Sequence, residues 1–484
     1  MRLSSDSVVF CCDLRAHTEP LPHFWEHTVG SCHATLALRA DWQAQLTRAR
    51  RELGFGHVRF HGLLDDDVGT LVCEQDRLIY SFFNADQIID FLLSIDMRPF
   101  VELSFMPAAL SSGSTTVFHY RGNVTPPRDL QAWAQLISCL VRHWVQRYGV
   151  AEVRRWYFEV WNEPNLPAFF TGGQAKYFEL YRATAQAIKA IDAQLRVGGP
   201  ATAANAWIPE FLAFCTAQGA PVDFVTTHHY PTDAFGAPGD DTAAQLAASP
   251  RSALQRQARQ VREQAGEHAV YYTEWSTSSN ARDALHDESY AASFIVKTVL
   301  EARGLVQGYS YWTFTDIFEE NYFPSRPFHG GFGLLTLHGI AKPAYRAFQL
   351  LHGLGTELYP VTGEHPTVDC WLVGDQASAT VLLTNYAQPR HAIAAQRVQV
   401  HLRHCSPRRA RLRRIDAHHA NPKQRWLQMG APDYLSRAQC AELHAASVCR
   451  SRPLRLEATG SAVAFTLTVP PLGVAAVHLQ MNGA

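Results

Sequence analysis

The feature that most constrains this chain is a regular alternation of short β-rich segments with longer helix-like segments over its first 350 or so residues. Eight such alternations predict a (β/α)8 TIM barrel. A doubly wound sheet would need a Gly-rich phosphate loop after the first strand, and none is present. The eight β-rich segments are Val8–Leu14, His57–Leu64, Arg98–Phe105, Trp156–Asn162, Leu195–Pro200, Val222–Tyr230, His268–Trp275 and Val306–Phe314.

The segments between them carry helical periodicity. In residues 130–148 the apolar positions follow i, i+3, i+4 spacing, with Asp129 placed to cap the start and Gly149 the end. The other helix candidates are Asp41–Leu53, Asp86–Ile95, Gln174–Ile191, Trp207–Gln218, Pro250–Gln264, Ser289–Arg303 and Ala341–Leu351.

The character of the chain changes after about Gly353, where short strand candidates are separated by Gly, Pro and polar residues. A single core rarely exceeds roughly 300 residues, so a second domain is expected in a chain of 484 residues. We predict a catalytic barrel at residues 8–353 and an accessory β-sandwich at 354–484, with a short helical insert near Leu435–Ala445. Residues 1–7 are expected to add a strand to the sandwich.

Composition excludes several classes of function. A net charge of −1 and a pI near 7.1 argue against nucleic acid or an anionic membrane as partner. No apolar run approaches the roughly 20 residues of a membrane span, and no secretory signal is visible, so we expect a cytoplasmic protein. The ten cysteines form no C-x-x-C pair and no H-E-x-x-H is present, so no metal and no cofactor is predicted. Nothing in the sequence indicates an oligomeric state.

Polar residues gather where a barrel places its chemistry, at the C-terminal ends of the strands. These residues are His61, Asp65–Asp67, Asn162, Glu163, His228, His229, Glu274, Trp312, Asp316, Glu319 and Glu320.

Two of them, Glu163 and Glu274, end the fourth and seventh strands, which lie on opposite sides of an eight-stranded barrel. Hydrolysis of a glycosidic bond needs an acid for the leaving oxygen and a negative charge opposite an oxocarbenium-like centre. A carboxylate separation of roughly 5 Å gives retention of configuration, and a wider gap gives inversion. The pair therefore predicts a glycosidase.

The residues around Glu163 fit this chemistry. Pro164 stops the strand directly after the acid, and Asn162 can donate to a sugar 2-hydroxyl. Glu159 has the opposite strand parity to Asn162, so we expect it on the outer face, in a structural salt bridge. Apolar walls for the sugar are offered by Trp161, Trp275 and Trp312.

An ordered series of motifs resembles glycoside hydrolase family 39, the family of β-xylosidases and α-L-iduronidases. The carboxylates lie in "WNEPN" (161–165) and "YYTEWSTS" (271–278). The other matching motifs are "RFHGLLDDDVG" (59–69), "RPFVELSFMP" (98–107), "GNVTPP" (122–127), "PVDFVTTHHY" (221–230), "YSYWTFTDIFEE" (309–320), "FHGGFGLL" (328–335) and "WLQMGAPDYLS" (426–436).

The resemblance implies that Glu163 is the acid/base and Glu274 the nucleophile of a retaining mechanism. It also implies a sugar site, in which His229 is the alternative to His228, and Glu319 the alternative to Glu320. The residues assigned to that site are His61, Asn162, His228, Tyr230, Trp312 and Glu320.

The implied activity is that of an exo-β-D-xylosidase acting on xylo-oligosaccharides or aryl xylosides. Other specificities of the same chemistry are an α-L-arabinopyranosidase, a β-galactosidase or an α-L-iduronidase. An iduronidase must bind a uronate carboxylate, and the strand ends offer no evident basic pair for it. A non-enzymatic alternative is an inactive carbohydrate-binding barrel, which retention of both carboxylates disfavours. Departures from the family pattern lie mainly in the loop after the sixth strand, residues 231–240.

Overall fold

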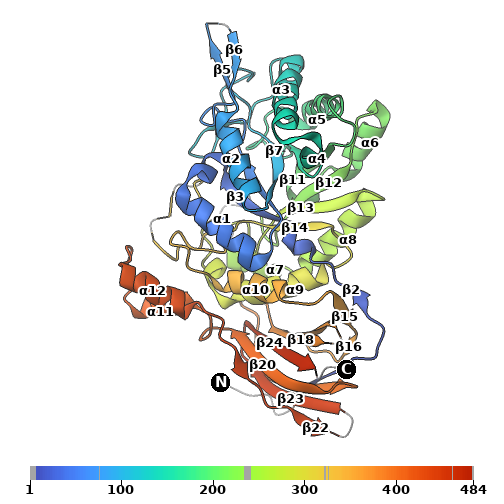
Figure 1. Cartoon of the computed structure of the whole chain (residues 1–484), viewed down its shortest axis with the longest axis vertical. Coiled ribbons are helices and arrows are strands. Elements are labelled where there is room, and N and C mark those ends of the chain that lie inside the picture. Colours follow the sequence, from blue (N-terminus) through green and yellow to red (C-terminus); the bar gives the residue numbers. More distant parts are fainter. Residues whose placement is uncertain are drawn as a thin grey trace.

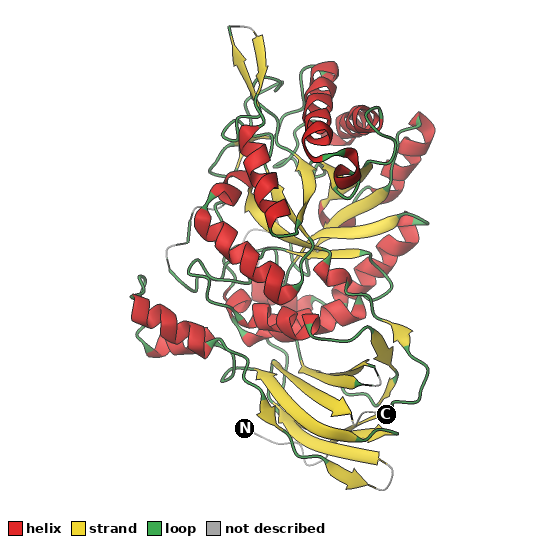
Figure 2. Cartoon of the chain, in the orientation of Figure 1, coloured by secondary structure: helices red, strands yellow, loops and turns green. Residues whose placement is uncertain are grey.

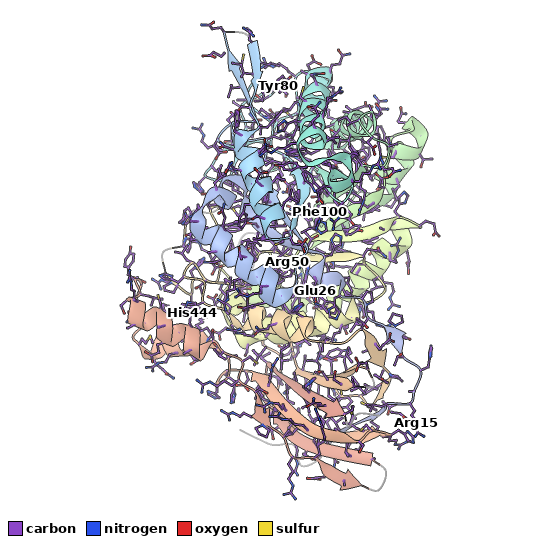
Figure 3. The ribbon with its side chains drawn as sticks, viewed as in Figure 1. Arg15, Glu26, Arg50, Tyr80, Phe100 and His444 are labelled. Carbon is purple, nitrogen blue, oxygen red and sulfur yellow. The ribbon has the colours of Figure 1, made fainter. Side chains whose placement is uncertain are left out.

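A barrel and a β-sandwich are stacked along the long axis of the molecule (Figure 1). The computed structural model describes residues 7–75, 77–233, 241–320, 323–324, 326–375, 377–459 and 462–481. Residues 1–6, which are most of the segment predicted to add an N-terminal strand, lie outside the described residues. So do residues 234–240 of the loop at 231–240. Phe100, labelled in Figure 3, lies within the barrel half, and His444 marks a helix of the other half.

Eight parallel strands close the barrel that the sequence predicts, in the order β10-β11-β12-β13-β14-β3-β4-β7. The first and last of them along the chain meet where Tyr311 pairs with Val29. The strands are β3 (Thr28–His33), β4 (His57–His61), β7 (Arg98–Leu103), β10 (Tyr157–Val160), β11 (Arg196–Thr202), β12 (Phe224–His229), β13 (Ala269–Trp275) and β14 (Gly308–Tyr311).

The prediction that Val8–Leu14 forms the first barrel strand is wrong. Strand β1 (Val8–Asp13) lies in the sandwich, parallel to β19 (Gln396–Arg403). Its side chains alternate, with Val8 and Phe10 buried and Val9 45% exposed. Strands of a parallel barrel are buried on both faces, whereas a strand buried on one face is typical of a sandwich.

The first barrel strand is instead β3, a segment whose sequence, TVGSCH, carries a weak strand signal. Its Gly30 has a packing reason: a Cβ there would lie 2.5 Å from the indole of Trp312. The small residue thus makes room for an aromatic side chain at the barrel mouth, and the strand loses the bulky residues that would have identified it.

The helices lie outside the barrel strands, as Figure 2 shows in red. Helix α3 begins after Asp129, whose side chain accepts from Gln131 N at 2.8 Å, and ends at Gly149, so both predicted caps are confirmed. No helix among the described residues is both long and apolar enough to cross a bilayer. The helices of the barrel half are α1 (Ala40–Leu53), α2 (Phe83–Ser94), α3 (Leu130–Tyr148), α4 (Val150–Val153), α5 (Gly173–Lys189), α6 (Ile208–Gln218), α7 (Thr242–Ala248), α8 (Ala253–Ala265), α9 (Ser289–Glu301) and α10 (Pro343–His352).

The sandwich packs two sheets around their own apolar core. One sheet consists of β16 (Val361–Thr362), β1, β19, β23 (Ala462–Val469) and β22 (Glu457–Thr459). The other consists of β2 (Glu19–Pro20), β15 (Glu357–Tyr359), β17 (Val368–Gly374), β18 (Ser378–Asn385), β24 (Gly473–Met481), β20 (Pro407–Ile415) and β21 (Arg452–Pro453). Helices α11 (Pro422–Gln428) and α12 (Arg437–Ala446) form an insert that projects to one side (Figure 1).

Candidate active site

A buried arginine organises the mouth of the barrel. Arg59 comes from β4, and its side chain is fully buried. Its guanidinium nitrogens lie 2.9 Å from Glu102, 2.5 Å from Glu159 and 2.9 Å from Glu274. A buried charge is tolerated only when it is paired and hydrogen-bonded. One cation therefore holds three carboxylates from three other strands in fixed positions.

The structure brings the two predicted catalytic carboxylates together. One oxygen of Glu163, one oxygen of Glu274 and one ring nitrogen of His228 all lie within 4.8 Å of one another. Glu163 is 9% exposed and Glu274 is 5% exposed. This separation matches the roughly 5–5.5 Å of retaining glycosidases, and is too short for the extra water of an inverting mechanism.

The backbone at the end of β10 aims Glu163 at the pocket. Trp161 has φ of 74° and Glu163 has φ of 43°, in the left-handed region that residues other than glycine rarely adopt. The turn at Trp161 breaks the alternation of side chains, so Asn162 and Glu159 both face inward, where Arg59 binds each of them. The prediction that Glu159 faces outward is wrong, because strand parity cannot be counted through this turn.

An irregularity in β13 does the same for the second carboxylate. Thr227 pairs with Tyr272 and His228 pairs with Glu274, so Thr273 has no opposing residue on β12. Such an extra residue bends a strand and changes the direction of its side chains. Both Thr273 and Glu274 consequently hydrogen-bond to groups inside the barrel.

The structure separates the two adjacent histidines at the end of β12. His228 Nδ1 lies 2.9 Å from Glu163 Oε1, inside the candidate site. His229 points away, with Nε2 2.8 Å from the hydroxyl of Tyr309 and its ring stacked on Tyr272. Of the two alternatives, His228 is therefore the residue that reaches the site.

Four further residues predicted for the sugar site surround the carboxylates. Tyr230 donates its hydroxyl proton to Glu274 Oε2 at 2.9 Å. His61 Nε2 lies 3.4 Å from Glu320 Oε1, and its ring centroid is 4.8 Å from that of Trp312. Glu320 Oε1 is buried and, beyond this contact with His61, has no hydrogen-bond partner among the described residues, so it has a lone pair left to accept from a sugar hydroxyl.

Glu319, the alternative to Glu320, is committed elsewhere. Its Oε1 lies 2.8 Å from His33 Nδ1. The other ring nitrogen of His33 lies 3.3 Å from Asp65 and 3.4 Å from Asp67, and the ring stacks on Tyr120. Burial opposes the charge on this imidazole, but the hydrogen bonds to carboxylates outweigh it and raise the pKa of His33 to about 11.

The surroundings shift the pKa values of the two candidate carboxyls, Glu163 and Glu274, to different extents. Burial, followed by the negative charge of Glu274, raises the pKa of Glu163 well above its usual value. Burial also raises the pKa of Glu274, to about 7, against the lowering effect of Arg59. Arg59 contacts Glu274 and not Glu163, so the proton is retained by Glu163.

The two histidines nearest the pair also differ in charge. Burial disfavours a charged His61, but Glu102, whose Oε2 lies 2.7 Å from its Nδ1, raises the pKa to about 10. Burial and then the charge of Arg59 lower the pKa of His228 well below its usual value. His61 is therefore a cation, and His228 is neutral.

Sequence reasoning missed several residues of this site: Arg59, Glu102, Thr273 and His33. Arg59 had a signal, because "HVRFH" alternates polar and apolar residues in a strand whose apolar face packs against helices. Thr273 had none, because adjacent residues of a regular strand face opposite ways, and only the register shift in β13 lets Thr273 share the barrel interior with its neighbour Glu274.

Three groups of described residues could offer three metal-ligand atoms each: His23, Glu26 and His352; His33, Asp65 and Asp67; and Glu163, His228 and Glu274. In the second group the imidazolium of His33 already balances the carboxylates. In the third group, the guanidinium of Arg59 balances the charge of Glu274. The barrel mouth thus neutralises its acids with the chain's own cations.

Comparison with known proteins agrees with this geometry. The sequence profile of glycosyl hydrolases family 39 matches residues 11–461. A β-xylosidase of Caldicellulosiruptor saccharolyticus is 49% identical over 469 residues, covering 95% of this chain and 96% of that one. A β-xylosidase of Geobacillus stearothermophilus is 40% identical over 356 residues, 70% of each chain. The crystal structure of a monomeric β-xylosidase from Caulobacter crescentus CB15 is 36% identical, with a TM-score of 0.89 over 99% of this chain and 100% of that one. Motifs, fold and these matches together establish that the chain belongs to glycosyl hydrolase family 39.

Proposed function

We propose that this protein is a retaining exo-β-D-xylosidase, which releases terminal β-linked xylose from short xylo-oligosaccharides and aryl xylosides by double displacement. The observation that carries the proposal is the approach of Glu163 and Glu274 to within 4.8 Å in a buried cluster. The two relatives described as β-xylosidases, at 49% and 40% identity, support the choice of sugar.

In the first step the protonated Glu163 gives its proton to the glycosidic oxygen while Glu274 attacks the anomeric carbon. Arg59 and Tyr230 both bond to Glu274, which favours its ionised form and fixes the direction of attack. The aglycone leaves as the bond to the anomeric carbon breaks, and a glycosyl ester of Glu274 forms.

In the second step a water molecule attacks the ester. Esterification removes the negative charge of Glu274, which was one cause of the raised pKa of Glu163. Glu163 is then a carboxylate facing the incoming water, and it takes the proton of that water as general base. Two inversions at one carbon give a product with the anomeric configuration of the substrate.

The remaining residues have roles in binding the sugar. Arg59 occupies the Oδ1 of Asn162, so the amide NH2 of Asn162 is left to donate to the 2-hydroxyl. Glu320 Oε1, which lies 3.4 Å from the charged His61, accepts from a hydroxyl farther along the ring. Trp312 supplies an apolar wall.

The charge of the site favours a neutral sugar over a uronate. The cations at the described mouth, Arg59, His61 and His33, are already paired with carboxylates. A substrate carboxylate placed there would meet Glu320 and Glu274 without a free basic partner.

A panel of 4-nitrophenyl glycosides tests the proposal. We expect the β-D-xyloside to have the highest kcat/KM, ahead of the α-L-arabinopyranoside and β-D-galactoside, with the α-L-iduronide not cleaved. Proton NMR of the first product should show β-xylose before mutarotation. A first product with the α configuration, or no release from any glycoside of the panel, would overturn the proposal.

A further inference from the structure

Four buried side chains form a continuous hydrogen-bonded chain that ends on the acid/base. Thr273 Oγ1 lies 2.7 Å from Glu159 Oε1 and 3.1 Å from His228 Nε2. His228 Nδ1 in turn lies 2.9 Å from Glu163 Oε1. Glu159, Thr273 and His228 are at most 1% exposed, so no solvent group competes with their partners.

The number of protons available decides which group donates and which accepts in each of these hydrogen bonds. Glu159 is held by Arg59 at 2.5 Å and acts as an acceptor, so the hydroxyl of Thr273 donates its single proton to it. The oxygen of Thr273 must then accept from His228, which places the imidazole proton on Nε2. A neutral imidazole protonated at Nε2 has a lone pair at Nδ1, and only a protonated Glu163 can donate to it.

We propose that Thr273 is a positioning residue that fixes the tautomer of His228, so that His228 accepts a hydrogen bond from Glu163 and keeps this acid protonated. The inference rests on the function proposed above, in which Glu163 is the acid/base. Thr273 touches neither substrate nor the reacting atoms, and acts entirely through His228.

The same arrangement helps the second half of the reaction. After Glu163 has given its proton to the leaving oxygen, its carboxylate faces the lone pair of His228 Nδ1 at 2.9 Å. Two acceptors in contact are unfavourable, so the carboxylate regains a proton readily, and the attacking water supplies it. His228 neither gains nor loses a proton over the cycle.

Other charged groups also face Glu163 and His228, and each remains in place when Thr273 is changed. Glu274 Oε2 lies 3.7 Å from His228 Nδ1, and Arg59, His61 and Glu320 act on Glu163 through their charges. The remaining neighbour, His229, acts on His228 from the other face of β12.

The first test compares Thr273→Val with Thr273→Ser in the pH dependence of kcat/KM on an aryl β-xyloside. Valine is nearly isosteric but cannot accept from Nε2, so the tautomer that donates from Nδ1 to an ionised Glu163 becomes favoured. We expect the alkaline limb, which reports the free acid, to move down by on the order of one pH unit. The Ser variant should keep the wild-type limb.

A matched control is Thr227→Val on the neighbouring strand. The hydroxyl of Thr227 is also fully buried and donates to the carbonyl of Thr202 at 2.8 Å. Among the described residues, Thr227 is not part of the hydrogen-bonded series that runs from Glu159 to Glu163. This variant should lose a comparable hydrogen bond and leave the limb unchanged. An unchanged limb in Thr273→Val, or an equal shift in Thr227→Val, would overturn the proposal.

A second measurement does not depend on the folding or activity of any Thr273 variant. Nitrogen-15 NMR of histidine-labelled wild type, with His228→Asn to assign the signal, reports which ring nitrogen carries the proton. A proton on Nε2 supports the inference, and a proton on Nδ1 refutes it. If wild type cleaves no xyloside, the proposed function fails, while the tautomer remains a separate result.

Discussion

The floor and the mouth of the barrel are built from the same strands, two residues apart, and their chemistry is opposite. Inward-facing residues at i are aromatic, and those at i+2 are polar or charged. The pairs are Phe100 and Glu102 in β7, Tyr157 and Glu159 in β10, and Tyr271 and Thr273 in β13. Side chains on one face of a strand recur every two residues, so two residues along each strand lead from the packed layer to the polar layer above it.

The floor is a closely packed aromatic layer. The rings of Phe100 and Tyr157 stack with centroids 5.0 Å apart, and Phe224 meets Tyr157 edge-on at 5.4 Å. Glycines on neighbouring strands make room for it, since a Cβ at Gly198 would lie 2.3 Å from the ring of Phe224. A floor of this kind excludes water from below, so charges in the layer above interact in a low dielectric. The floor stabilises the fold, and through this exclusion it strengthens the electrostatics of the mouth.

Replacing Glu274, the proposed nucleophile, should give the largest difference between the effect on activity and the effect on stability. In Glu274→Ala, turnover should fall by on the order of 10⁴-fold or more, because no covalent intermediate can form. Unfolding temperature should stay the same or rise, because removing a carboxylate leaves fewer acids to share Arg59. Kinetics and calorimetry on one preparation measure both. In wild type, a 2-fluoro-xyloside should label Glu274, and a label on another residue would contradict the assignment.

A substitution in the floor should lower stability strongly and change activity little. Phe224 is 1% exposed, and Phe224→Ala should lower the free energy of unfolding by about 3–5 kcal/mol through the cavity it leaves. At 25 °C the folded fraction should keep kcat/KM within about threefold of wild type, because the ring packs on the floor residues Phe100, Tyr157 and Tyr271. Denaturant titration and steady-state kinetics measure the two effects.

Phe83→Ala is the matched control for the floor variant, since Phe83 is 81% exposed and the change should cost less than about 0.5 kcal/mol. If Phe224→Ala loses as much turnover as Glu274→Ala, the division between floor and mouth is wrong.

Much of the barrel could be predicted because burial leaves a strong signature. Seven of its eight strands and the capped helix after Asp129 follow from apolar runs and helical periodicity. The remaining strand, β3, could not be found, since Gly30 is small to accommodate Trp312, a contact 282 positions along the chain. Strand β1 resembles a barrel strand in composition, and its one-sided burial and its pairing with β19 show that it belongs to the sandwich.

The candidate site divides in the same way. Glu163 and Glu274 could be predicted because each ends a recognisable strand within a specific motif. The shared inward direction of Glu159 and Asn162, and of Thr273 and Glu274, could not, since a left-handed residue at Trp161 and a register shift in β13 break the alternation within each pair. The choice between His228 and His229 likewise depended on where each ring finds a partner.

The smallest expected effect is on how the free energy of unfolding depends on pH, through a histidine beside the floor. His57, whose ring stacks on that of His27, donates from Nδ1 to the carbonyl of His27 at 2.9 Å, and burial lowers its pKa to about 4. In the unfolded chain the pKa is near 6.5, so the unfolded state binds more protons between these values. The stability that neutral His57 contributes is therefore complete above about pH 6.5 and is lost as the pH falls toward 4. His57→Gln keeps a donor but cannot titrate. Between about pH 7 and about pH 4.5, wild type should therefore lose about 1–2 kcal/mol more unfolding free energy than His57→Gln loses. The exposed His418→Gln should match wild type at both values. Equal losses in wild type and His57→Gln would show that the acid sensitivity of this protein resides in the charged mouth and not in the floor.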